Sequence, residues 1–244
     1  MFSDAVHIRP AMRHEARTIA KLFLISSDGL AAYVWQQLAG PDDLLLAVGA
    51  KRYARDDIPC SYKNCLVAER AGRIIGMVHS VPIEDDLPDC YIPELPGDAV
   101  LKPYKELTSH QPPSLFVSGL AVFPAARRQG VGSRLLAAVR ERARGLGLDQ
   151  LSLICFEPNE GACRLYRSQG FAVTARRPLV PHPLLHYSAG DALLMVAPSD
   201  PIGAMAEPQP EEDDARPFLP TALPAAPTGP LHHCGQPIGE CQCS

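Results

Sequence analysis

Apolar residues recur along the chain with two periods, one typical of helices and one typical of strands. In the first eighty residues, Ile19, Ala20 and Phe23 form a helical stripe, and two β-rich runs flank the pair Ala71-Gly72. A short glycine-bearing pair between two such runs is typical of a hairpin turn. This part of the chain predicts a strand at 5–9, helices at 14–24 and 29–39, and paired strands at 64–70 and 73–81.

The pattern is interrupted at residues 82–114, which are polar and proline-bearing, so we expect a long loop or an irregular insertion there. The apolar run that follows reads as a strand that Pro124 ends, and Gly119 inside it indicates a bulge. Beyond this point strands and helices alternate again. The predicted elements are a strand at 115–123, a helix at 131–147, a strand at 149–156, a helix at 161–170, and strands at 171–177 and 191–197.

The order of elements predicts an α/β (α+β) domain with a mostly antiparallel sheet and a strand–helix–strand unit in its middle. Composition then changes near Pro198, because the next 46 residues hold nine prolines, the acidic run EEDD and no apolar period. Such a segment buries too little apolar surface to offset the entropy of ordering it. We expect a folded domain over residues 1–198 and a disordered, Pro-rich acidic tail over residues 199–244.

Charge and composition narrow the class of protein. The formal net charge is −4, so no strongly basic face indicates nucleic-acid binding. No run approaches the roughly 18 apolar residues of a membrane span, and the first residues do not resemble a signal peptide. The eight cysteines include no Cys-x-x-Cys pair, and several lie in apolar runs as small core residues do. We expect a cytoplasmic protein that binds neither nucleic acid nor membrane.

The tail ends with a cluster of histidine and cysteine residues within twelve positions. Its spacing, Cys-x6-Cys-x-Cys, is not a usual zinc pattern, and no second cluster accompanies it. Metal binding and an incidental tail in a reducing environment both stay open, and we predict no metal requirement. The residues concerned are His232, His233, Cys234, Cys241 and Cys243.

Residues 127–133, RRQGVGS, place two arginines and two glycines directly before a predicted helix. The first turn of a helix offers unpaired N–H groups and the positive end of the helix dipole. Glycine allows an anion to approach the backbone, and arginine adds charge and paired donors. The run is neither a P-loop nor a dinucleotide fingerprint, and it also serves as an ordinary helix start. By itself it leaves both interpretations open.

A second motif follows the first after one helix and one strand: residues 159–171 read N-x-x-A-x-x-L-Y-x-x-x-G-F. Together with LAVFPAARRQGVGSRLL, this segment resembles the GNAT superfamily of N-acetyltransferases, over about residues 5–198. The resemblance implies a GNAT-like fold, with a mixed, mostly antiparallel sheet of six to seven strands, about four flanking helices and a splayed central strand pair. The motifs are specific to the superfamily and not to one substrate.

The resemblance also implies acetyl-CoA as the co-substrate. In that family the R/Q-x-x-G-x-G/A loop binds the pyrophosphate, the strand before it meets the pantetheine arm, and the asparagine often contacts the cofactor. Carried over residue by residue, the cofactor-binding set is Leu120, Ala121, Val122, Arg127, Arg128, Gln129, Gly130, Val131, Gly132, Ser133 and Asn159.

Tyr166 matches the family's tyrosine, which implies a catalytic general acid. An amine attacks the thioester directly, and a phenol of pKa near 10 protonates the leaving thiolate. The backbone N–H of Val122 is the expected donor to the oxyanion. A core tyrosine on a short amphipathic helix is the alternative role of Tyr166. The predicted reaction is transfer of an acetyl group to a primary amine of a small molecule or a protein.

The resemblance does not extend to the general base. Many family members place a glutamate on the strand before the loop, but here the corresponding residues, Phe116–Leu120, include no carboxylate. The missing carboxylate keeps open a non-catalytic module that binds acyl-CoA, and a third possibility is an unrelated phosphate-binding protein. Candidate bases are His79, Glu84, Asp85, Glu157 and His186.

The acceptor is only weakly indicated. Residues 84–98 carry six acids and no base, which favours a cationic amine if this loop overhangs the cleft and is otherwise a solvated acidic loop. The loop between the last two strands mixes aromatic, apolar and imidazole groups and is a plausible acceptor wall. The identity of the amine, the acyl length and the oligomeric state, including a homodimer, stay open.

Overall fold

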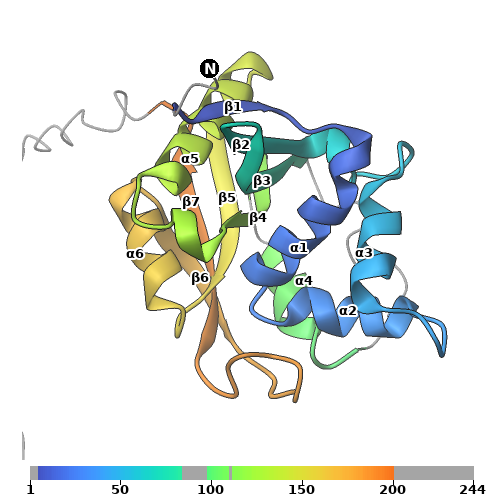
Figure 1. The fold of residues 1–244 in the computed structure, drawn as a ribbon. Helices are drawn as coiled ribbons and strands as arrows, with labels where there is room; N and C mark the ends of the chain where they lie inside the picture. The colour runs from blue at the N-terminus through green and yellow to red at the C-terminus, as the bar shows by residue number, and fades with distance from the viewer. Residues whose placement is uncertain (1–4, 84–97, 110–111, 201–244) are drawn as a thin grey trace, which may run out of the picture. The chain divides into compact units, whose positions relative to one another are not determined.

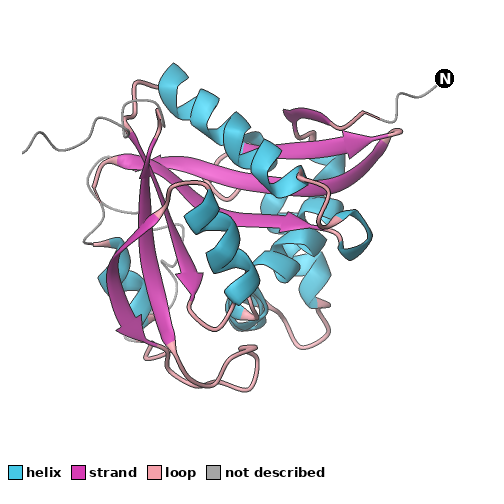
Figure 2. Cartoon of the chain, turned by 90° about the vertical axis from the view of Figure 1, so that its left-hand side faces the viewer, coloured by secondary structure: helices cyan, strands magenta, loops and turns pink. Residues whose placement is uncertain are grey.

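The computed structural model describes residues 5–83, 98–109 and 112–200. Their strands form one seven-stranded sheet, in the order β1-β2-β3-β4-β5-β7-β6, with helices on both faces (Figures 1 and 2). The strands are β1 (His7–Pro10), β2 (Cys65–Arg70), β3 (Arg73–Ile83), β4 (Ser114–Val122), β5 (Gln150–Phe156), β6 (Ala172–Pro178) and β7 (Asp191–Pro198). The α-helices are α1 (Ala16–Ser26), α2 (Leu30–Leu38), α3 (Leu45–Tyr53), α4 (Lys102–Thr108), α5 (Val131–Gly145) and α6 (Glu160–Ser168).

The predicted fold class is confirmed: neighbouring strands are antiparallel except for β4 and β5, which are parallel. The hairpin turn between β2 and β3 also lies where the sequence predicts it. Ala71 and Gly72 both have positive φ, 49° and 74°. Two successive left-handed residues are the mark of a type I′ turn, whose twist matches that of the strands it joins.

Two helices in the described residues, α3 and α4, were not predicted from the sequence. Helix α3 has a glycine, Gly49, in its middle, where the indole of Trp35 lies so close that a Cβ would meet it at 2.3 Å. Helix α4 has seven residues and falls inside the stretch predicted as a long loop, so that part of the prediction is wrong. Pro103 is tolerated in α4 because it stands in the first turn, where a missing N–H breaks no helical hydrogen bond.

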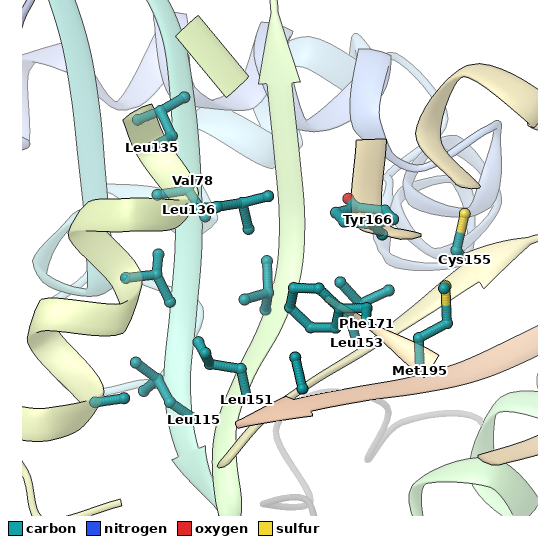
Figure 3. Packing of buried hydrophobic residues seen from close by; sticks show 14 of the residues in the cluster. Val78, Leu115, Leu135, Leu136, Leu151, Leu153, Cys155, Tyr166, Phe171 and Met195 are labelled. Carbon is teal, nitrogen blue, oxygen red and sulfur yellow. The ribbon is translucent and has the colours of Figure 1, made fainter. Parts of the chain in front are cut away.

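The core has one apolar layer on each face of the sheet. Helix α5 lays Leu135, Leu136 and Val139 on one face, and α1 lays Ile19 and Leu22 on the other. Figure 3 shows the first of these layers, with Tyr166, Phe171 and Leu153 among its members. Side chains of successive strand residues alternate between the two layers, as the pleat of a sheet requires. Of the eight cysteines, those at positions 60, 65, 155 and 163 are buried free thiols, as expected of small core residues.

The central strands β4 and β5 separate partway along their length. They pair only from Leu115 opposite Leu151 to Val117 opposite Leu153, although β4 continues to Val122 and β5 to Phe156. At the same point β4 slips against β3, because His79 faces Gly119 while Ser80 faces Val117, which leaves Ser118 as an extra residue. The predicted bulge and the splayed strand pair are therefore both present, and the bulge marks where the pair opens.

In the part of the chain that the structure describes, no helix has the length and apolar character needed to cross a membrane. Strand β7 ends at Pro198. The predicted tail lies outside the described residues from residue 201 onward, and so does the cysteine and histidine cluster at its end. The division of the chain at Pro198 stays a prediction.

Candidate active site

A cavity of about 1050 Å³ opens where β4 and β5 separate. One wall, which we call the motif wall, is formed by the end of β4, the loop to α5 and helix α6. The other, which we call the helical wall, is formed by α1, α2, α4 and the loop before β7. Representative lining residues are Leu120, Gly130 and Tyr166 of the motif wall and Asp28, Tyr104 and His186 of the helical wall.

The loop that begins α5 has the backbone geometry of an anion site. Arg128 and Gly130 have left-handed φ values of 62° and 75°, and Gly130 is the N-cap of the helix. It supplies no side chain to the first helical N–H groups, and the first helical hydrogen bond runs from Arg134 N–H to the carbonyl of Gly130, 3.1 Å away. The N–H groups of Val131, Gly132 and Ser133 therefore have no acceptor within the helix. Around Gly130 there is open space, since a Cβ there would meet nothing within 4 Å.

The side chains of this loop divide into two groups. Arg127 and Arg128 are exposed and line the cavity, and Arg127 Nε donates to the carbonyl of Val122 at 3.0 Å. Gln129 is engaged elsewhere, because its Oε1 accepts from Arg70 at 2.6 Å and its Nε2 donates to the carbonyl of Ala125 at 3.2 Å. The two arginines therefore supply the positive charge beside the helix start, while Gln129 fixes the loop to β2.

Strand β4 turns alternate backbone groups toward the cavity. The N–H of Phe123 donates to the carbonyl of Ile75 at 2.9 Å, which sets the alternation of the β3–β4 ladder. Counting back, the N–H and C=O groups of Val122 and Leu120 point away from β3, toward the side where β5 has separated. Ala121 has its backbone on the β3 side and contributes its methyl group to the wall. The N–H of Val122 is thus oriented as expected for an oxyanion donor.

Tyr166 belongs both to the core and to the cavity. Its side chain packs at 64° against the ring of Phe171, with centroids 5.7 Å apart, and the residue is 8% exposed and lines the cavity. Burial raises the pKa of Tyr166 above its ordinary value of 10, and the nearby Cys155 and Asp28 raise it further. At neutral pH the phenol is therefore a proton donor. The structure places Tyr166 in a position that fits both roles considered from the sequence.

Asn159 lines the cavity as the N-cap of α6, but its amide is already occupied. Its Oδ1 accepts from the N–H of Ala162 at 3.1 Å, and its Nδ2 donates to Asp28 Oδ2 at 2.8 Å. Asn159 therefore starts the helix that carries Tyr166 and links that helix to the helical wall.

Asp28 is the residue of the site that sequence reasoning missed. It stands in the turn between α1 and α2 with φ of 48°, and its carbonyl accepts from the N–H of His186 at 2.9 Å. Burial raises the pKa of its carboxyl, against the opposing effects of Asn159 and His186. The only sequence signal was an Asp-Gly pair between two predicted helices, which also marks an ordinary turn.

The candidate bases lie in different places. His79 is fully buried behind Ser118, with Nδ1 2.5 Å from Ser118 Oγ and Nε2 3.0 Å from the carbonyl of Pro59, and burial lowers its pKa to about 4. Glu157 is exposed and lies 3.7 Å from Arg176. His186 lines the cavity. Glu84 and Asp85 lie outside the described residues, as does most of the acidic loop.

Residues 34–171 match the family described as "Acetyltransferase (GNAT) family". The matched stretch includes both sequence motifs, β2 to α6 and the bulged strand. The chain belongs to the GNAT acetyltransferase family, as the resemblance of its motifs implied.

A curated relative, described as an uncharacterized N-acetyltransferase, YdgE, of Bacillus subtilis strain 168, is 35% identical over 65 residues. This match covers 27% of the present chain and 41% of the relative's length.

Solved structures share the fold at lower identity. An agmatine N-acetyltransferase is 20% identical with a TM-score of 0.59, and a polyamine N-acetyltransferase of Drosophila melanogaster is 19% identical with a TM-score of 0.58; each match covers 80% of this chain and 100% of the other. An N-acetyltransferase of Staphylococcus aureus Mu50 is 22% identical with a TM-score of 0.53, over 78% of this chain and 99% of the other. At these identities the likeness concerns the fold.

Proposed function

We propose that the protein is an N-acetyltransferase that transfers an acetyl group from acetyl-CoA to a primary amine of a small molecule or a protein. The observation that carries the proposal is the cavity between the splayed strands, which joins an open helix start to a buried tyrosine. Family membership supports acyl transfer, and the agmatine and polyamine enzymes of similar fold make amines the first acceptors to test.

The motif wall fits acetyl-CoA in its chemistry. Unpaired N–H groups at the start of α5, beside Arg127 and Arg128, suit a diphosphate, and the open space at Gly130 leaves room for it. The outward-facing peptide groups of Leu120 suit the amides of a pantetheine arm, which would extend β4 as a strand does, while the carbonyl of Val122 already accepts from Arg127. When bound, acetyl-CoA supplies an activated acyl thioester.

Within this proposal the protein contributes position, a hydrogen-bond donor and a proton. The N–H of Val122 stabilises negative charge on the carbonyl oxygen, and Tyr166 delivers its proton to the departing sulfur. The phenol suits that task because burial keeps it protonated. The largely apolar surroundings of the cavity, such as Leu120, Phe116 and Ile154, strengthen both contributions by excluding water.

A second candidate function is a module that binds acyl-CoA without turnover. The observation that favours it is the absence of a carboxylate from β4, where Ser118 stands at the bulge with its hydroxyl against His79. A thiol-release assay over a panel of amines that includes agmatine and polyamines separates the two. We expect amine-dependent release of CoA by the wild type. Tight binding of acetyl-CoA without release for any amine would favour the binding module instead.

A further inference from the structure

The cavity contains a carboxylate at the point where its two walls meet. Asp28 lines the cavity and its side chain is only 14% exposed. It is held from two directions, by Asn159 Nδ2 of the motif wall at 2.8 Å and by the imidazole of His186, whose Nδ1 lies 3.7 Å from Asp28 Oδ1. Burying a carboxylate in this way costs free energy unless the group is hydrogen-bonded or paired with an opposite charge.

The backbone holds this carboxylate in place at a local cost. Asp28 has a left-handed conformation, and so does Gly29, with φ of 96°. A Cβ on Gly29 would come within 2.0 Å of the carbonyl oxygen of Leu184, so the turn is pressed against the loop before β7. Strained backbone that is fixed by its surroundings is typical of groups that must keep one position. The packing of this turn against the loop before β7 therefore fixes the position of Asp28 in the cavity wall.

Three phenols of neighbouring elements line the same cavity as this carboxylate. Tyr104 of α4, Tyr166 of α6 and Tyr187 of the loop before β7 all line the cavity. Burial raises the pKa of each, and the negative charge of Asp28 contributes to the rise in all three. The expected acid of the reaction thus lies within electrostatic range of Asp28.

One of these phenols is left without a hydrogen bond. The hydroxyl of Tyr104 is buried, and among the described residues it has no partner. A buried hydroxyl without a partner is uncommon, since most buried polar side-chain atoms are hydrogen-bonded. The apolar residues Leu30, Val34 and Leu101 of the same wall also line the cavity.

We propose that Asp28 is the proton acceptor of the transfer reaction, and that it docks the ammonium group of the amine. This inference rests on the proposed acetyltransferase function and adds its missing base. It also defines the acceptor class, a primary amine that is protonated at neutral pH and attached to an apolar stem.

The protons balance as follows. The docked ammonium gives one proton to the carboxylate of Asp28, and the free amine forms the new C–N bond while the C–S bond breaks. Tyr166 gives its proton to the sulfur, and the surplus proton on the nitrogen restores the phenol. Asp28 then releases its proton to solvent past His186, whose side chain is 59% exposed. The net products are the amide, the free thiol and one proton.

The same geometry sets the pH dependence. Burial raises the pKa of Asp28 above its ordinary value of 3.8, while the facing Asn159 and His186 lower it in part. The other titratable groups within electrostatic range of it are the phenols of Tyr104, Tyr166 and Tyr187 and the thiol of Cys155, which stay neutral because burial raises the pKa of each. We expect kcat/KM for the amine to fall in acid as Asp28 becomes protonated, at a higher pH than for an exposed carboxyl.

The variant Asp28→Asn tests the proposal with little disturbance. Asparagine tolerates left-handed φ, and its carbonyl can still accept from Asn159. We expect kcat/KM for the amine to fall by roughly 10²–10⁴-fold, the range for loss of a general base, and its acid limb to disappear. The dissociation constant of CoA and the melting temperature should match the wild type. Asp43→Asn, which alters an exposed carboxylate that accepts from the N–H of Gly40 at 2.9 Å, is the matched control and should keep full activity.

Three results would overturn the proposal. If Asp28→Asn keeps wild-type kcat/KM and an acid limb, Asp28 is not the base. If its activity falls together with CoA affinity and melting temperature, Asp28 only fastens the turn to α6. If the wild type binds CoA but releases no thiol with any amine, the acetyltransferase proposal fails and this one fails with it. If the wild type releases thiol and only the Asp28→Asn variant loses this activity, the result supports both the acetyltransferase proposal and the role of Asp28.

Discussion

The two walls of the cavity are built in different ways. The motif wall uses two short segments, the end of β4 with its loop into α5 and the first two turns of α6, and it offers mainly backbone groups. The helical wall gathers side chains from α1–α2, α4 and the loop before β7, which lie far apart in the sequence. A wall that offers backbone N–H and C=O groups from short segments requires particular residue types at fixed spacing. A wall made of side chains from several elements has no such requirement. The two walls therefore differ in how far a local sequence motif can reveal them.

Among the residues named from the sequence, the largest effect is expected at Tyr166 of the motif wall. Tyr166→Phe removes the proton donor and keeps the ring against Phe171, so kcat should fall about 10²–10³-fold with CoA affinity retained. Steady-state thiol release and calorimetric titration with CoA measure the two quantities. Tyr62→Phe, at a half-buried tyrosine whose hydroxyl donates to Asp56 at 2.8 Å, is the control and should keep wild-type kcat. Unchanged kcat in Tyr166→Phe would leave this residue only its role in the core.

His79, which lies on β3 behind the bulge of the motif wall, tests how stability depends on a buried neutral imidazole. Its pKa is lowered from 6.5 to about 4 by burial, so the unfolded chain takes up a proton more readily than the folded one. Stability from this group is complete above pH 6.5 and is lost as the pH falls toward 4, by about 3 kcal/mol at the lower limit. Urea unfolding at a series of pH values measures it, and His79→Gln should flatten this part of the profile. An equally steep loss in the variant would assign the acid sensitivity to other groups.

A smaller effect is expected at the glycine that begins α5. Gly130 and Gly147 stand at opposite ends of this helix, both have left-handed φ, and a Cβ at either would meet nothing within 4 Å. Alanine at each should cost about 1–2 kcal/mol of stability. Only Gly130→Ala should also weaken CoA binding, by about tenfold, because only Gly130 lines the cavity. If the two variants bound CoA with equal affinity, the loop before α5 would not be part of the CoA site.

The smallest effect is expected from one surface charge of the motif wall. Arg127 is exposed, so a favourable contact with a phosphate is worth only about 1 kcal/mol, and Arg127→Gln should raise the dissociation constant of CoA about fivefold. The loss should shrink as salt is added. Arg73→Gln, at the exposed hairpin end, is the control. A changed amine preference at saturating CoA would contradict the division between the two walls.

The sequence was informative wherever structure follows from local pattern. Periodicity predicted α1, α2, α5 and the strands, and the bulge near Gly119 followed from a glycine within an apolar run. It did not predict α3 and α4, because Gly49 and Pro103 are ordinarily loop signals and only packing against Trp35 and the last strands makes helices there. Local pattern is thus a weak guide where tertiary contacts decide.

The same limit applies to the site. The residues of the motif wall were named because two contiguous motifs resemble those of the GNAT family. Asp28 and Tyr104 were missed because their places in the cavity depend on how α1–α2 and α4 pack against the sheet, which no local motif encodes. The general base proposed here is therefore the residue that the sequence was least able to indicate.

The short helix α6 fixes the distance between two residues of the site, Asn159 and Tyr166. It has nine residues, with Asn159 capping its start and Tyr166 seven positions later, about 10 Å along the axis and on the same side. Since Asn159 also holds Asp28, one helix spaces the residue proposed to give a proton from the residue proposed to take one. An insertion or deletion between positions 159 and 166 would rotate the two proton-handling groups out of register and should be selected against.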